Sequence, residues 1–163
     1  MHLTRARLVL TAAAVLALLG ALAAFWSGPE PRPAPGITLS PDNPEVVAEG
    51  RRLYDAQCAS CHGAELQGQP EWQVRKPDGK LPAPPHDATG HTWHHPDQVL
   101  FALTKYGPSR VIGDPAYQSD MPGYDQTLSD DQIIAVLSFI KSTWPAEIRE
   151  RHDRMNEQAR QQH

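Results

Sequence analysis

The clearest helical pattern along the chain lies near its C-terminal end. Ser129 is a typical N-cap, acidic residues follow it in the first turn, and a Trp-Pro pair ends the pattern. We therefore predict a helix over residues 129–143. Five apolar residues recur within it at the spacing of one helix face: Ile133, Ile134, Val136, Leu137 and Ile140.

Two further helices are predicted from residues that begin and end helices. Asp42 or Asn43 can cap a helix over 45–57, with a proline at its first turn. Asp97 lies in the first turn of a second helix over 97–106, which a Gly-Pro pair ends. The stretch between these helices is rich in proline and glycine and has little strand character. The pattern therefore predicts an all-α domain with three main helices and long loops.

The first 26 residues have the features of an export signal. Arg5 and Arg7 precede an apolar run without a charge, from Leu8 to Trp26. About 20 apolar residues cross a bilayer, so we expect residues 1–26 to form an N-terminal hydrophobic helix that anchors the chain. The positive end would stay inside, which places the rest on the periplasmic side of a bacterial inner membrane. A small-x-small motif near residue 22 leaves open cleavage as a signal peptide.

Proline and charge divide the remainder of the chain. Residues 27–43 are rich in proline, which predicts a stiff, extended linker. The folded domain is expected over 44–145. Residues 146–163 are strongly polar and form a charged tail, either a solvated helix or a frayed end, to which we assign no chemistry.

The two cysteines of the chain, Cys58 and Cys61, are followed directly by His62. The spacing Cys-x-x-Cys-His is the attachment signature of c-type haem. Two thiols at this spacing can form thioethers with one edge of the porphyrin, and the next residue places an imidazole beneath the iron. A disulfide or half of a zinc site would also use two cysteines, but structural zinc needs further ligands of this kind. We therefore predict one covalently bound haem c, with His62 as an iron ligand.

The sequence around this motif resembles the class I cytochrome c family, and the resemblance covers about residues 42–144. Gly50 and Tyr54 stand in the register usual for the first helix of that family. In the family this glycine permits a close crossing of the first and last helices. The resemblance implies a cytochrome c-like fold, in which the matching positions on the last helix would be Val136 and Phe139.

The resemblance also implies a second iron ligand. The methionines that follow the motif are Met121 and Met155, and Met155 lies in the charged tail. Met121 lies in a loop just before the last helix, where the family places its axial methionine, so His62 and Met121 are the predicted axial pair. In the family a backbone carbonyl holds the other N–H of the axial histidine, and here Pro84 or Pro85 would supply it.

A cluster of histidines lies between the first two predicted helices, around Trp93. Imidazoles at this density could bind copper or zinc, which would make the protein a copper-linked cytochrome. They could instead lie at the haem edge and hydrogen-bond the propionates together with Trp93, cap the helix that begins near Asp97, or replace Met121 on the iron. The cluster consists of His86, His91, His94 and His95.

Charge and chemistry together favour an electron carrier over an enzyme. Residues 42–144 hold 14 acidic and 8 basic side chains, a net charge of −6, so nucleic acid is not expected as a partner. With both axial positions filled, the iron has no place for a substrate. We expect one-electron transfer with redox proteins of the periplasm or membrane. The alternatives are a haem subunit of an oxidase or dehydrogenase complex, or a haem enzyme or sensor in which Met121 is not bound.

Overall fold

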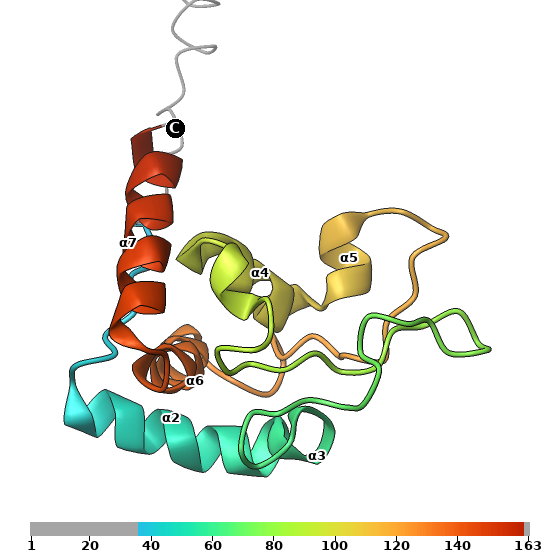
Figure 1. Ribbon diagram of the computed structural model, residues 1–163, viewed down its shortest axis with the longest axis horizontal. Coiled ribbons are helices and arrows are strands. Elements are labelled where there is room, and N and C mark those ends of the chain that lie inside the picture. The colour runs from blue at the N-terminus through green and yellow to red at the C-terminus, as the bar shows by residue number, and fades with distance from the viewer. Residues whose placement is uncertain (1–35, 162–163) are drawn as a thin grey trace, which may run out of the picture. The chain divides into compact units, whose positions relative to one another are not determined.

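The computed structural model describes residues 36–161, which form helices joined by loops, with no β-strand in this range (Figure 1). The all-α class is therefore confirmed for this part of the chain. The hydrophobic helix expected over residues 1–26 lies outside it. Within 36–161 no helix is long and apolar enough to cross a membrane. The elements are α2 (Pro44–Gln57), α3 (Ala59–His62), the 3-10 helix η1 (Thr92–His94), α4 (Asp97–Tyr106), α5 (Pro108–Ile112), α6 (Asp130–Ser142) and α7 (Ala146–Gln161).

The two longest predicted helices of the domain begin where their caps indicated. Asn43, rather than Asp42, caps α2, because its side-chain oxygen accepts from the backbone N–H of Glu45 at 3.0 Å. Ser129 and Gln132 form a reciprocal capping box at the start of α6. Such caps satisfy N–H groups that a helix leaves without partners in its first turn.

The helix α6 packs against both α2 and α4 (Figure 1). Its apolar stripe faces them, and Ile133, Val136 and Ile140 are almost fully buried. Tyr54 of α2 is also fully buried and packs on Phe139, with ring centroids 5.4 Å apart. The predicted periodicity of this segment therefore corresponds to the side of α6 that forms the core.

Gly50 lies where α2 and α6 cross. A Cβ at this position would lie 1.9 Å from the carbonyl oxygen of Ala135 and 2.9 Å from the Cβ of Phe139. Phe139 was an expected partner, but Ala135 takes the place that we expected for Val136. The contact is with the backbone of α6, so no side-chain rotation can relieve it.

Replacing Gly50 with alanine is expected to destabilise the fold by about 2 kcal/mol, within the range of overpacked cores. The added methyl forces α2 away from Ala135, although alanine gains about 1 kcal/mol of helix propensity over glycine. Denaturant unfolding of the haem-loaded protein measures the change. Ala48→Gly, at an exposed position of the same helix, is the control because it reports the propensity term alone. Equal or greater stability of Gly50→Ala would contradict the close crossing.

The segments expected to be linker and tail both contribute contacts to the domain. Leu39 is buried in the core, and the backbone N–H of Ser40 donates to the Ser138 hydroxyl at 2.9 Å. At the other end, α7 follows α6 (Figure 1) and contacts η1. The folded unit is therefore longer at both ends than the expected range of 44–145.

Polar side chains attach α7 to the domain. His152 is fully buried, and its Nε2–H donates to the carbonyl of His95 at 2.9 Å. Asn156 accepts from the backbone N–H of Asp97 at 2.8 Å and donates to the Asp97 carboxylate at 3.1 Å. Because buried polar groups are costly unless they are paired, this network fixes how α7 docks.

The stability of the protein is expected to fall as the pH drops below about 6.5, the ordinary pKa of histidine. Burial, followed by the nearby positive charge of Lys141, lowers the pKa of His152. The unfolded chain therefore binds a proton that the folded chain rejects, and this favours unfolding at lower pH. Denaturant unfolding at pH 7.5 and 5 should show a smaller loss for His152→Gln than for the original chain. The other histidines are present in both proteins, so equal losses would show that His152 is not buried in its neutral form.

Candidate haem site

The predicted attachment motif lies on one helical turn. The helix α2 ends at Gln57, and Cys58 donates its backbone N–H to Tyr54 at 2.8 Å before α3 begins. Gly63 then ends α3 with a positive φ of 82°. Cys58 is half-buried and Cys61 is exposed, and both are free thiols. Burial raises the pKa of the Cys58 thiol to about 11.

His62 is buried, and one of its ring nitrogens forms a hydrogen bond with the backbone. Its Nδ1–H donates to the carbonyl oxygen of Pro84 at 2.8 Å, so Pro84 is confirmed as one of the two expected partners. This bond fixes the tautomer and leaves Nε2 with a free lone pair. Burial lowers the pKa of His62, although the Pro84 carbonyl acts in the opposite direction. The ring is therefore neutral at pH 7, the form in which an imidazole binds a metal.

A tight turn brings the Pro84 carbonyl to His62. Gly68 donates its backbone N–H to the carbonyl of His62 at 2.7 Å and has a positive φ of 66°. A Cβ at Gly68 would lie 2.5 Å from the nitrogen of Pro85. Glycine at this position therefore lets the proline segment approach the histidine closely.

The loop that carries Met121 is tied to the attachment motif. Met121 is half-buried. Tyr124, three residues later, donates its hydroxyl to the carbonyl of Gln57 at 2.8 Å, directly before Cys58. Its backbone N–H donates to Thr104 near the end of α4 at 3.1 Å. The loop is therefore anchored to both α2 and α4.

Two lysines hold the other side of the same loop. The ammonium groups of Lys76 and Lys80 both bind the carboxylate of Asp120, which directly precedes Met121. These ammonium groups lower the pKa of Asp120. The guanidinium of Arg75 lies 5.9 Å from the ring centroid of Tyr117. The three basic side chains of this segment, Arg75, Lys76 and Lys80, are therefore engaged within the chain.

The clustered histidines divide among different contacts. His86 stacks on His62 with ring centroids 4.0 Å apart. His91 is exposed and stacks on Trp72 at 5.3 Å, and His94 stacks on Trp93 at 3.7 Å. The backbone of His95, as noted, binds α7.

Two hypotheses for the histidine cluster, a copper site and a cap for α4, gain no support from these contacts. No group of three metal-binding side chains (His, Cys, Asp or Glu) converges within residues 36–161, so nothing here supports the copper hypothesis. No histidine caps α4 either: Pro96 is its N-cap, and the side chain that accepts from its first N–H, at Asp97, is that of Asn156.

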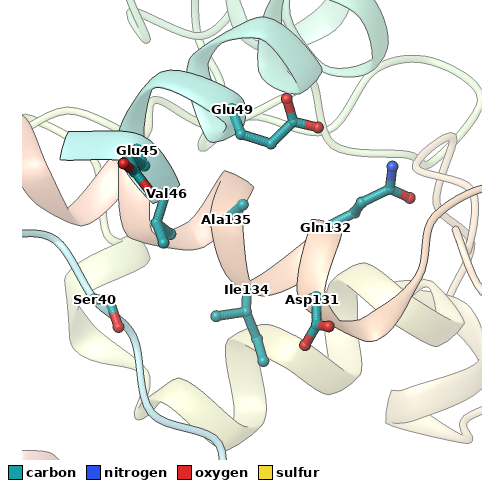
Figure 2. A pocket seen from close by; sticks show the side chains of 8 residues that line it. All are labelled: Ser40, Glu45, Val46, Glu49, Asp131, Gln132, Ile134 and Ala135. Carbon is teal, nitrogen blue, oxygen red and sulfur yellow. The ribbon is translucent and has the colours of Figure 1, made fainter. Parts of the chain in front are cut away.

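A groove of about 400 Å³ lies elsewhere, between the N-terminal halves of α2 and α6 (Figure 2). Val46, Ile134 and Ala135 form its apolar part, with the carboxylates of Glu45 and Glu49 nearby. The cysteines, the histidine cluster and Met121 do not line it. The groove is therefore separate from the candidate haem site.

Comparison with known proteins agrees with the motif. The model of the family described as cytochrome c matches residues 47–144. The chain belongs to the cytochrome c family. It is also similar to cytochrome c-555 of Prosthecochloris aestuarii, with 31% identity over 67 residues, which cover 37% of this chain and 68% of that protein. No solved structure gives a significant match.

Membership in this family makes covalently bound haem c the cofactor of this cytochrome and electron transfer with redox partner proteins its general activity. One observation tests whether the residues fit that cofactor. Among the described residues, Trp93 buries its indole Nε1–H without a hydrogen-bond partner. An orphaned donor of this kind is rare and needs an acceptor. A haem propionate is such an acceptor, so Trp93 fits the group.

Sequence reasoning missed several residues that support this cytochrome's site. The contact of His86 with His62 and the bond from Tyr124 to Gln57 depend on the paths of loops, which no short spacing reveals. The packing of α7 on the domain could have been predicted from the sequence. Its residues that are at least partly buried recur at helical spacing within the charged tail: Ile148, Arg149, His152, Met155, Asn156 and Ala159.

Proposed function

We propose that this cytochrome is a one-electron carrier in which Cys58 and Cys61 hold the haem through thioethers and His62 and Met121 are its axial ligands. When bound, the haem supplies a one-electron Fe(III)/Fe(II) couple. The observation that carries the proposal is the 2.8 Å bond from His62 Nδ1–H to the Pro84 carbonyl. It presents a neutral imidazole, with a free Nε2, on the turn that also carries both thiols.

The position of the Met121 loop supports the second ligand. Tyr124 ties this loop to the residue before Cys58, and Asp120 is clamped by two lysines. Met155, the other downstream methionine, lies on α7 instead. A thioether is a soft ligand and raises the reduction potential of a haem relative to other ligand sets. As a ligand, Met121 would both keep a substrate from the iron and raise the reduction potential of the haem.

Trp93 and His62 are proposed to hold the cofactor at two different places, a propionate and the iron. Trp93 offers its buried N–H to a propionate, which orients the haem without a charge. His62 keeps its ring in place through Pro84. These residues bind and orient, and no acid–base pair is needed for electron transfer.

We further propose that the domain works on the periplasmic side of an inner membrane, held there by residues 1–26. The apolar run from Leu8 to Trp26, the arginines before it and the proline-rich linker support this location. The same features suit a haem subunit of an oxidase or dehydrogenase complex. Detergent extraction of tagged protein from membranes separates these alternatives, because a subunit copurifies with its complex in fixed ratio and a free carrier does not.

Absorption spectra of the purified haem-loaded protein test the ligand assignment. The oxidised form is expected to show the weak near-infrared charge-transfer band of methionine-ligated iron. The reduced form should bind carbon monoxide slowly or not at all. A high-spin spectrum with rapid carbon monoxide binding would overturn the carrier and favour a haem sensor or enzyme.

A further inference from the structure

A second imidazole lies flat against the ring of His62. The rings of His86 and His62 are stacked, with centroids 4.0 Å apart and planes 22° apart. Tyr54 approaches His86 edge-on, with ring centroids 6.2 Å apart. Because Tyr54 belongs to the buried core, His86 fills the space between that core and the proposed iron ligand.

The backbone of His86 is fixed on both sides. Its N–H donates to the carbonyl of Leu66 at 2.8 Å. Its carbonyl accepts from the indole N–H of Trp144 at 2.8 Å. Leu66 itself has a positive φ of 64°, which non-glycine residues rarely adopt. The chain thus holds an uncommon conformation in the loop where it contacts His86.

The side chain of His86 is fixed as well. Its Nδ1 forms a 2.8 Å hydrogen bond with the hydroxyl of Thr92, and Thr92 is buried. Burial, with His62 and His91 nearby, lowers the pKa of His86 well below its ordinary value. The ring of His86 is therefore held against His62 by its bond to Thr92 and by its fixed backbone.

We propose that His86 is a positioning residue that sets the rotation of the His62 ring and so the direction of its imidazole plane relative to the haem. The inference rests on the proposed ligation by His62. The Pro84 bond holds Nδ1 of His62, and a single hydrogen bond tolerates only small rotations of the ring about its Cβ–Cγ bond. The ring of His86, stacked on the face of His62, restrains these remaining rotations. In oxidised haem the direction of this plane decides how unpaired spin spreads over the porphyrin.

Two substitutions in the haem-loaded protein test this role. His86→Leu removes the flat ring and its hydrogen bond, whereas Thr92→Val keeps the ring and removes the hydroxyl that binds it, which also forms a long bond of 3.4 Å to the Pro85 carbonyl. Electron paramagnetic resonance g-values and proton NMR shifts of the haem methyls should change in both, more strongly in His86→Leu. His91→Leu, in the same loop but exposed and stacked on Trp72, should leave both unchanged.

The outcomes separate this inference from the proposed ligands. A low-spin original protein with the methionine band, whose g-values and methyl shifts stay the same in both variants, would overturn the role of His86 alone. If His86→Leu yields no haem-loaded protein, Thr92→Val decides by the same criterion. A high-spin original protein would overturn the ligand assignment and this inference with it.

Discussion

Replacing both Cys58 and Cys61 with serine is expected to abolish covalent haem attachment completely. Cys58 lies between α2 and α3 and Cys61 lies within α3, and neither is in a disulfide. Serine keeps the size and polarity of the side chain but cannot form the thioether. After acid–acetone extraction, haem should leave the double variant and stay with the original chain, as haem-stained denaturing gels would show.

The same substitution is expected to lower stability sharply. A covalent haem is held at a high effective concentration, whereas free haem stabilises the fold only as its concentration exceeds its dissociation constant. Haem would also supply the acceptor proposed for the indole N–H of Trp93, which the described residues leave without a partner. Thermal unfolding should therefore become dependent on added haem. Ser60→Ala, between the cysteines, is the matched control and should keep the haem through extraction.

Much of the fold could be predicted because its main helices carry local signals. The cap at Ser129 and the apolar stripe of α6 act within a few residues, so the sequence alone located this helix. The helix α7 was not predicted as part of the domain, because its buried face centres on the polar residues His152 and Asn156. Their partners, Asp97 and the carbonyl of His95, lie far away in the sequence.

The candidate site was also predicted only in part. Cys58, Cys61 and His62 are adjacent in sequence, and the resemblance also supplied the carbonyl now found at Pro84. The stacking of His86 on His62 was not predicted, because it depends on where the loop after Pro84 runs. At Gly50 the crossing was expected but its contact falls one residue earlier, at Ala135, because the crossing geometry decides which backbone atoms meet.

Replacing Met121 with alanine is expected to remove the methionine charge-transfer band entirely and to lower the reduction potential. The thioether is the proposed axial ligand, and its loss leaves water or another side chain to bind the iron. The loop should remain in place, since Tyr124 and Asp120 hold it through contacts that Met121 does not make. Spectra and potentiometric titration of the haem-loaded variant measure both effects, and carbon monoxide should now bind rapidly.

Met155→Ala provides the matched comparison. Met155 is also half-buried, but it lies on α7 within the charged C-terminal helix. Its removal should cost some packing energy and leave the band, the potential and carbon monoxide binding as they were. Loss of the band in Met155→Ala, with Met121→Ala unaffected, would place the ligand on α7. Absence of the band in the original protein itself, with a low-spin spectrum, would mean that neither methionine binds the iron, and a histidine of the 86–95 loop would then be the first residue to test.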